Sequence, residues 1–324
     1  MNSASEAKAQ PSFDLDRFLH AERARVEVAL EAALGRVLPR LDAALRGPVR
    51  QGVTTGGKRL RPILCVEAWR ASAVEAQAAD AAAGETAGEA GDEAIYAVAA
   101  SLELVHAYSL MHDDLPSMDN APLRRGLPTP HMTWGEEATT LGGAALIPAA
   151  GLEVWEASGR MNLPDPDRRE LLRTLARAAG AGGMVGGQAL DLEGEGRALG
   201  LEELDALHRA KTGALLTASL RMGALAARAP VSRLAALEAY GRAIGLAFQV
   251  ADDILDATAS AEALGKNPSD ATLDKSTYVR HLGVEGARAE ARKLVAEAIE
   301  ALADGGVASP ALVALARYVV ERDR

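Results

Sequence analysis

Apolar residues recur at three- and four-residue steps along most of the chain, which is the spacing of amphipathic α-helices. The pattern begins near Phe13 and predicts a helix that runs to Leu41, and a second long apolar run predicts a helix over about Glu93–His112. Strand-like alternation of Val, Ile, Thr and Tyr is scarce. Further predicted helices cover about Glu136–Gly159, Pro166–Gly180, Leu201–Arg228 and Val231–Thr258, with two more between Val284 and Asp323. The pattern therefore predicts an all-α fold.

Glycine, proline and low-complexity segments divide these helices. Residues 1–11 are polar and are expected to form a disordered arm. Gly56 and Gly57 mark a loop, and residues 71–92, rich in Ala, Gly and acidic side chains, are expected to form a mobile loop between helices. No segment has the composition of a domain linker, so residues 12–324 are expected to form a single domain.

Composition supports a globular helical protein and limits its possible partners and cellular compartment. The chain has 324 residues, 48% of them hydrophobic and only 3% aromatic, and its net charge is 35 − 45 = −10. An acidic surface disfavours nucleic acid and anionic lipid as partners. Cys65 is the single cysteine, the N-terminus lacks the apolar core of a signal peptide, and the longest uncharged stretch, 138–152, is too short to span a bilayer. These features predict a soluble cytoplasmic protein without a membrane anchor.

One acidic motif lies at the end of the predicted helix over 231–258. Asp252 and Asp256 are four residues apart, so they are about 40° apart around the helix axis and share a face, with Asp253 beside them. Gln249 lies about one turn earlier on the same side. Carboxylates this close repel one another unless a cation lies between them, and oxygen ligands suit Mg²⁺. A solvated acidic patch is the alternative interpretation of such a motif when it stands alone.

The other acidic motif follows the predicted helix that ends near His112, and it comprises Asp113, Asp114 and Asp119. Asp113 and Asp119 are six residues apart, about 120° on an ideal helix, so a straight helix would separate them. Pro116 ends the helix, and the chain can then bend and return Asp119 towards Asp113.

Cationic residues elsewhere provide the complementary charge for a phosphorylated ligand. Lys58 and Arg61 follow the glycine pair and lie on one side of a starting helix, where they are candidate phosphate ligands. Arg124 and Arg125 follow the first acidic motif, and His106 lies two turns before Asp113. Additional candidate donors are Lys211, Thr212, Lys266 and Lys275. Each lysine or arginine would be a solvent-facing charge if it stood alone, and a core position is the alternative for His106.

Motifs of other chemistries do not occur, including a Ser/His/Asp nucleophile pattern, zinc-type Cys/His spacing and a GxxxxGK[ST] loop. The chain instead resembles the short-chain trans-prenyl diphosphate synthases, and bacterial farnesyl diphosphate synthases most. The matching segments occur in order over most of the chain: GGKRLRP (56–62), LVHAYSLMHDDLPSMD (104–119), RRGLPTPH (124–131), GGMVGGQALDL (182–192), HRAKTGALL (208–216), GLAFQVADDILD (245–256) and LGK…DKSTY (264–278).

This resemblance implies a bundle of long helices around a central cavity, a homodimer, and head-to-tail condensation of isopentenyl diphosphate with dimethylallyl and then geranyl diphosphate. It implies that six aspartates hold three Mg²⁺ ions, which Mn²⁺ can replace: Asp113, Asp114, Asp119, Asp252, Asp253 and Asp256. It assigns to the allylic diphosphate Arg124, Lys211, Thr212, Gln249, Lys266 and Lys275. It assigns to isopentenyl diphosphate Lys58, Arg61, His106 and Arg125.

Product length in the family depends on the residue five positions before the first aspartate, which is Tyr108 here. An aromatic ring there implies a fifteen-carbon product, and core packing is the alternative role of this side chain. The sequence departs from the family pattern at Asn120, Leu127 and Ala144, and Pro148 is expected to interrupt its helix. The change at Ala144 is expected to weaken hydrogen bonding near the cavity.

Other functions remain open at this stage. A geranyl or geranylgeranyl diphosphate synthase would share every motif except the identity of the chain-length residue. A class I terpene cyclase would lack the second Asp-rich motif and the cations for a second diphosphate. A non-catalytic regulatory subunit would have lost carboxylates, whereas all six are present here.

Overall fold

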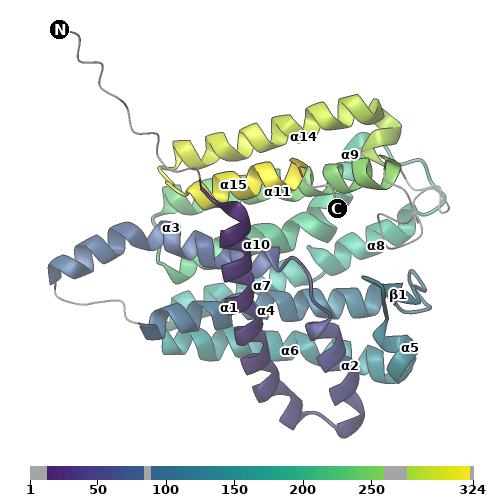
Figure 1. Ribbon diagram of the computed structural model, residues 1–324, viewed down its shortest axis with the longest axis horizontal. Coiled ribbons are helices and arrows are strands. Elements are labelled where there is room, and N and C mark those ends of the chain that lie inside the picture. The colour runs from purple at the N-terminus through teal and green to yellow at the C-terminus, as the bar shows by residue number, and fades with distance from the viewer. Residues whose placement is uncertain (1–12, 84–88, 259–275, 322–324) are drawn as a thin grey trace.

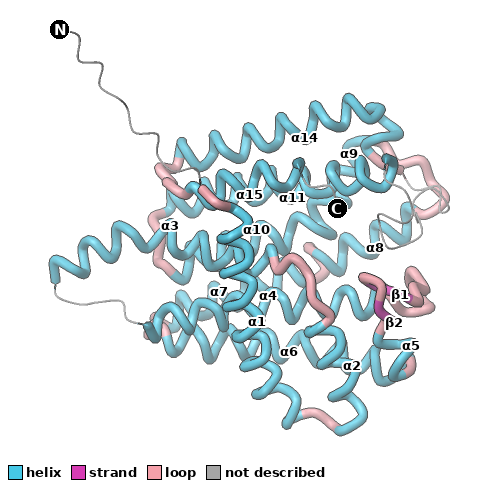
Figure 2. Tube along the Cα trace, viewed as in Figure 1, coloured by secondary structure: helices cyan, strands magenta, loops and turns pink. Residues whose placement is uncertain are grey.

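The computed structural model describes residues 13–83, 89–258 and 276–321, and Figure 2 shows that these residues are almost entirely helical. The α-helices are α1 Leu15–Val37, α2 Ala43–Thr54, α3 Leu60–Ala83, α4 Glu89–Asp113, α5 Pro130–Trp134, α6 Glu136–Arg160, α7 Asp165–Ala179, α8 Met184–Gly194, α9 Leu201–His208, α10 Ala214–Ala226, α11 Val231–Thr258, α14 Tyr278–Asp304 and α15 Pro310–Glu321. A 3₁₀ turn, η1 (Leu38–Arg40), follows α1, and a π-helical segment, η2 (Arg209–Gly213), joins α9 to α10. The one strand pair among the described residues is β1 (Leu123–Arg124) with β2 (Leu127–Pro128). The predicted all-α fold is confirmed.

The helices form a bundle in which α10 has a central place. It packs against α3, α7 and α11, while α4 packs along α6 and α11 packs along α14. In Figure 1 the long helices α14, α15 and α11 lie near one side of the bundle, and α1 crosses the others at a steep angle. The C-terminal ends of α4 and α11, which bear the two acidic motifs, are the parts of this bundle that matter for function.

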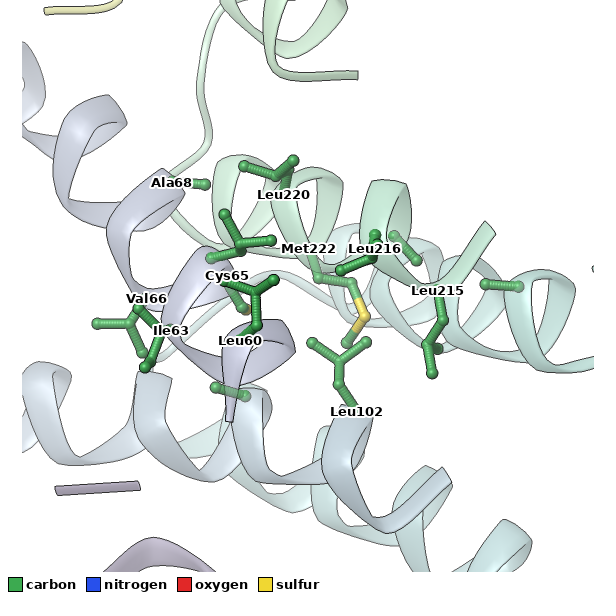
Figure 3. Close-up of a cluster of buried hydrophobic side chains, with 14 of the residues drawn as sticks. Leu60, Ile63, Cys65, Val66, Ala68, Leu102, Leu215, Leu216, Leu220 and Met222 are labelled. Carbon is green, nitrogen blue, oxygen red and sulfur yellow. The ribbon is translucent and has the colours of Figure 1, made fainter. Parts of the chain in front are cut away.

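A continuous apolar core holds these elements together. It extends from Val26 in α1 to Val319 in α15. Figure 3 shows part of it, where Leu60 of α3 and Leu102 of α4 lie near Met222 of α10, and Ile63 lies beside Val66 on α3. These side chains are almost fully buried. Burial of each such side chain contributes roughly 1.5–3 kcal/mol, so the core gives the site a rigid frame.

Three predictions about helix boundaries were wrong. The segment 71–92 was expected to be a loop, but α3 continues to Ala83 and α4 begins at Glu89, with residues 84–88 outside the described part. Alanine is the strongest helix former, and here its propensity outweighs the low complexity of the segment. The single helix expected over 201–228 is divided by η2 into α9 and α10.

The third wrong prediction concerns Pro148, because α6 runs through it without a break. The proline removes the hydrogen bond to the carbonyl of Ala144, four residues earlier. Both residues lie on the exposed face of α6, where water can satisfy that carbonyl. Ala144 is therefore on the outside of the bundle and is not among the described residues that line the site below.

Helix α4 is long and apolar enough to cross a membrane by length and composition alone, with a mean hydropathy of 1.4 over the stretch 92–113. Buried residues make up 78% of that window, and a core helix of a soluble protein passes the same test. The expected disordered arm, residues 1–11, lies outside the described residues.

Candidate active site

The first acidic motif lies where α4 ends and the chain turns back. After Asp113 the backbone forms a series of turns around Pro116, and the amide of Asp119 donates to the carbonyl oxygen of Asp113 at 2.9 Å. The predicted return of Asp119 towards Asp113 is therefore present. Asn120 has a left-handed backbone with φ of 47°, a conformation that Asn tolerates better than most residues, and this explains its place at the end of the turn.

Two carboxylates of this motif have different surroundings. Asp114 is only 1% exposed and accepts hydrogen bonds from Arg124, whose Nε lies 2.9 Å from both carboxylate oxygens and whose Nη2 lies 2.7 Å from Oδ1. Asp113 lines a pocket instead. Burial raises the pKa of Asp113 to about 6, assisted by the nearby carboxylate of Asp119 and opposed by Lys211. A cation beside this carboxylate would therefore stabilise its charged form.

The second acidic motif lies in the last turns of α11. Asp252, Asp253 and Asp256 line one pocket together with Gln249 of the preceding turn, as the helical spacing predicted. Asp253 is 4% exposed, and its Oδ2 accepts a hydrogen bond from the backbone amide of Tyr278 at 2.8 Å. This contact satisfies an amide in the first turn of α14 and ties that helix to α11.

Lys211 and Thr212 lie on the π-helical segment η2, and π-helical turns often mark functional positions. The ammonium of Lys211 lies 2.5 Å from Oδ2 of Asp191 in α8, and the hydroxyl of Thr212 donates to Oε1 of Gln249 at 3.1 Å. Gly187 allows α8 to approach closely, because a Cβ there would lie 2.1 Å from the amide nitrogen of Lys211. Close helix packing therefore sets the position of the lysine.

Two pockets meet at Lys211, which lines both of them. The first has a volume of about 370 Å³ and is largely apolar, with Arg61, His106 and Asp113 as polar members of its lining. The second has a volume of about 270 Å³ and is polar. Its carboxylates come from both acidic motifs, from α8 and from the residue that follows α8: Asp119, Asp191, Glu195, Asp252, Asp253 and Asp256. This pairing suits a ligand with an apolar chain and an anionic head that binds through cations.

The carboxylate donors fit magnesium. They are all oxygen ligands and are spread around a pocket, and among the described residues no three His, Cys, Asp or Glu side chains form one tight cluster. Mg²⁺ usually takes one or two protein carboxylates and completes its shell with water and phosphate oxygens, so dispersed donors suit a magnesium–diphosphate complex.

A second cationic group surrounds His106 on α4. Burial lowers the pKa of His106 well below its ordinary value, and the nearby guanidinium groups of Arg61 and Arg125 lower it further. Arg125 donates to the carbonyl of Gly56, and the Nε of Arg61 is buried without a hydrogen-bond partner. Lys58, expected in the same group, has its ammonium 5.9 Å from the ring centre of Tyr318 in α15. The predicted residues Lys266 and Lys275 lie outside the described part of the chain.

A family model described as polyprenyl synthetase matches residues 42–309. The chain belongs to the polyprenyl synthetase family. This family is of the magnesium-dependent prenyl synthase type, and isopentenyl and allylic diphosphates are substrates that fit it.

Individual members of this family are similar over nearly the whole chain. Farnesyl diphosphate synthase of Escherichia coli K12 is 41% identical over 292 residues, which cover 89% of this chain and 92% of that protein. Geranylgeranyl pyrophosphate synthase 9 of Arabidopsis thaliana is 39% identical over 96% of this chain and 82% of its own length. The crystal structure of an FPP/GFPP synthase from Zymomonas mobilis has a TM-score of 0.79 and 34% identity, covering 94% of this chain and 100% of that one.

Tyr108, the residue expected to set product length, lies in the wall of the first pocket. The ring of Tyr108 lines the 370 Å³ pocket and meets the ring of His112 edge-on, with centroids 4.6 Å apart. The Nε2 of His112 is hydrogen-bonded to the carbonyl oxygen of Thr140 in α6 at 3.0 Å, and Gly143 leaves room for this imidazole. The tyrosine is thus part of the pocket wall and is braced by α6 from behind.

Sequence reasoning missed two acidic residues that pair with cations in or beside the predicted site. Asp191 pairs with Lys211, and Glu103 pairs with Arg59 at 2.8 Å. Each interrupts an otherwise apolar helical run in the sequence, and a charged residue at such a position is a signal of a buried partner. Leu127, at a position where relatives often have a basic residue, is an exposed residue of β2.

Proposed function

We propose that this protein is a prenyltransferase of the farnesyl diphosphate synthase type. It would condense isopentenyl diphosphate with dimethylallyl diphosphate and then with geranyl diphosphate, releasing diphosphate at each step. The observation that supports this most directly is the junction at Lys211 of an apolar pocket with a polar pocket lined by carboxylates of both acidic motifs. The names of the bacterial relatives support the fifteen-carbon product.

The allylic diphosphate would lie between the two acidic motifs. The six aspartates of the two motifs would hold three Mg²⁺ ions, for which Mn²⁺ would substitute, and all of them except Asp114 line the pockets. Asp114 and Asp253, the buried members, would also hold Arg124 and α14 in place around the ions. When bound, the metal would neutralise the leaving diphosphate.

The donors of this subsite would be Arg124, Lys211, Thr212, Gln249, Lys266 and Lys275. Lys211 would contribute most, because it lies between the pockets and would turn from Asp191 to the diphosphate oxygens. The carbon–oxygen bond of the allylic substrate breaks as negative charge develops on the diphosphate, and the fixed cations stabilise that charge.

Isopentenyl diphosphate would bind without metal at the second cationic group, formed by Arg61, His106, Arg125 and Lys58. Neutral His106 would donate one hydrogen bond to a phosphate oxygen, since its pKa is lowered well below the ordinary value by burial and by Arg61 and Arg125. The double bond of this substrate attacks the allylic cation, and the new carbon–carbon bond forms. A proton then leaves the adjacent carbon for the released diphosphate, so the reaction needs no protein base.

The growing chain would occupy the apolar pocket, where the ring of Tyr108 would stop it at fifteen carbons. Apolar side chains that line this pocket, among them Leu110 and Leu192, would also keep water away from the allylic cation. Exclusion of water matters because hydrolysis competes with condensation.

We also propose a single-domain homodimer of the cytoplasm without a membrane anchor. The continuous core from α1 to α15 supports one domain over residues 12–324. Exposed apolar side chains on α6 at positions 141, 144, 148 and 152 share one helix face, and Leu141 is 59% exposed. A second copy of the chain would cover such a face. The single cysteine, buried in α3, is consistent with a reducing compartment.

The test is an assay of purified protein with Mg²⁺, isopentenyl diphosphate and either dimethylallyl or geranyl diphosphate, with no other protein added. We expect release of diphosphate and a fifteen-carbon product from both primers, identified by mass spectrometry. Absence of turnover with either primer would contradict the proposal and favour a regulatory subunit. A cyclic hydrocarbon formed without isopentenyl diphosphate would favour a terpene cyclase.

A further inference from the structure

The loop that precedes α3 has an unusual backbone. Gly56 and Gly57 have φ of 81° and 138°, which glycine adopts freely, but Arg59 has φ of 52°. A left-handed backbone is unfavourable for a residue with a Cβ, so a non-glycine residue keeps it only where its side chain is held. Arg59 is not among the residues that line the two pockets, whereas its neighbour Arg61 is.

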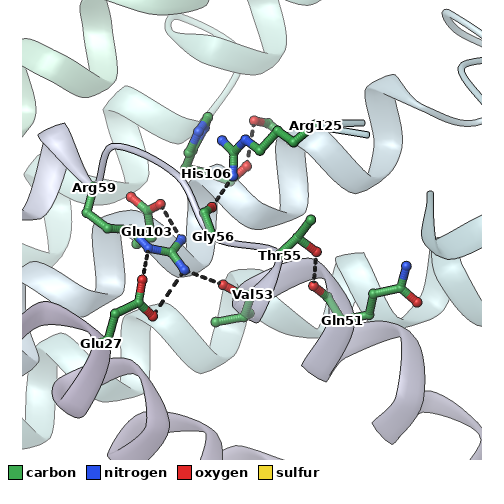
Figure 4. Close-up of polar contacts among 10 residues, drawn as sticks. Glu27, Gln51, Val53, Thr55, Gly56, Arg59, Glu103, His106 and Arg125 are labelled. Atoms are coloured by element: carbon green, nitrogen blue, oxygen red, sulfur yellow. Dashed lines mark hydrogen bonds and ion pairs between the residues drawn. The ribbon is translucent and has the colours of Figure 1, made fainter. Parts of the chain in front are cut away.

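The side chain of Arg59 is held from three directions and is 3% exposed (Figure 4). Its Nε donates to Oε1 of Glu27 in α1 at 2.7 Å, and its Nη1 donates to Oε1 of Glu103 in α4 at 2.8 Å. Its Nη2 donates to the carbonyl of Val53 at the end of α2 at 2.9 Å. One guanidinium therefore connects the loop to three helices, with planar geometry that lysine cannot reproduce.

The groups beside this guanidinium belong to the candidate isopentenyl diphosphate site. Lys58 directly precedes Arg59, and Arg61 follows it by two residues. Arg125 donates to the carbonyl of Gly56 in the loop before α3. Glu103 lies one turn before His106 on α4, so its carboxylate faces the same cationic group. Burial lowers the pKa of Arg61 and of Arg125, and the negative charge of Glu103 opposes this lowering.

We propose that Arg59 is a positioning residue for isopentenyl diphosphate: clamped by Glu103 and Glu27, it fixes the loop that carries Lys58 and leads into the first turn of α3, where Arg61 lies. The inference rests on the proposed function. The clamp acts on one substrate only, because it holds the metal-free cationic group and makes no contact with the acidic motifs. Loss of the clamp therefore raises the dissociation constant for isopentenyl diphosphate and leaves the allylic subsite unchanged.

The experiment compares Arg59→Gln, Arg59→Lys and Glu27→Gln with wild type. Glu31→Gln is the matched control, because Glu31 lies one turn after Glu27 on α1 and pairs with Arg50 at 3.1 Å, away from the loop. Binding of isopentenyl diphosphate is measured by calorimetry in EDTA, and steady-state kinetics give the KM of each substrate and kcat. Circular dichroism checks that each variant is folded.

We expect Arg59→Gln to raise the dissociation constant and the KM for isopentenyl diphosphate at least tenfold, with the KM for geranyl diphosphate within twofold of wild type. Glu27→Gln should raise the same constants about threefold, Arg59→Lys should fall between these two, and Glu31→Gln should match wild type. A general loss of structure would instead change kcat and both KM values together.

The inference is overturned if folded Arg59→Gln binds isopentenyl diphosphate within twofold of wild type, or if both substrates are affected equally. If Arg59→Gln does not fold, Glu27→Gln decides, and an unchanged dissociation constant overturns the inference. Failure of the proposed function has a different signature, since wild-type protein itself would then neither bind isopentenyl diphosphate nor release diphosphate.

Discussion

Replacement of Tyr108 by alanine should lengthen the product from fifteen to twenty carbons. The phenol ring lines the apolar pocket of about 370 Å³ and packs 4.6 Å from the ring of His112, so its removal extends the pocket towards α6. The bracing hydrogen bond between His112 and the carbonyl of Thr140 keeps the imidazole from collapsing into the space.

The size of the effect follows from the burial of one more isoprene unit. Five carbons buried at about 0.8 kcal/mol each would contribute up to about 4 kcal/mol. At about 1.4 kcal/mol per tenfold change, this corresponds to a factor on the order of 10²–10³ in favour of a fourth condensation. The twenty-carbon product should therefore become the main one when isopentenyl diphosphate is in excess.

The assay is mass spectrometry of the products after removal of the diphosphate, with geranyl diphosphate as primer. Tyr108→Phe is the matched control, because it keeps the ring and should keep the fifteen-carbon product. An unchanged product distribution in Tyr108→Ala, with activity retained, would refute the role of the ring as a stop and would leave it a packing residue.

Four further outcomes are expected. Lys211→Gln removes a charged hydrogen bond, typically worth about 1.5–3 kcal/mol, and should lower kcat/KM for the allylic substrate by roughly 10- to 150-fold, measured by steady-state kinetics with Lys293→Gln as the surface control. Removal of metal with EDTA should abolish diphosphate release, and added Mg²⁺ should restore it; activity that persists in EDTA would contradict the metal requirement. Burial lowers the pKa of His208 to about 4, so the unfolded state binds more protons between about pH 6.5 and 4, and stability should fall as pH falls through this window. From pH 7.5 to 5, wild type should lose about 2 kcal/mol more stability in urea unfolding than His208→Asn, in which Asp113 and the other groups titrate unchanged; equal changes in both proteins would refute the assignment. Leu141→Lys combined with Leu152→Lys should turn a dimer into a monomer in light scattering, and an unchanged mass would exclude this face of α6 as the interface.

Helical periodicity predicted most of the fold because each helix buries one face in a continuous core. The predicted ends of the helices near His112 and Thr258 agree closely with α4 and α11. Prediction failed where composition and local preference disagreed, as in the alanine-rich end of α3, and where solvent exposure decides the outcome, as at Pro148. A helix can continue through an exposed proline, and exposure is a tertiary property that spacing does not reveal.

The candidate site was predictable as a set of residues but not as a set of contacts. Spacing indicated that Asp252 and Asp256 share a face and that the chain must bend after Asp113, and both features are present. The pairing of Lys211 with Asp191 depends on the close packing of α8 on η2, which joins segments 20 residues apart through a contact at Gly187. Such pairings follow from helix packing, so the sequence alone predicted the site residues but not the side chains with which they pair.

Each acidic motif has a pair of adjacent aspartates, and in both pairs the second residue is anchored to the protein. The second residue of each pair, Asp114 or Asp253, is buried and bonded to the protein, through Arg124 in one case and the amide of Tyr278 in the other. The first residue of each pair, Asp113 or Asp252, lines a pocket, and Asp253 lines the polar pocket as well. Because adjacent residues on a helix point about 100° apart, one carboxylate can face the ligand while its neighbour anchors the surrounding structure. A buried carboxylate is costly unless it is paired, so the anchoring contacts also limit how far the motif can move when a cation binds.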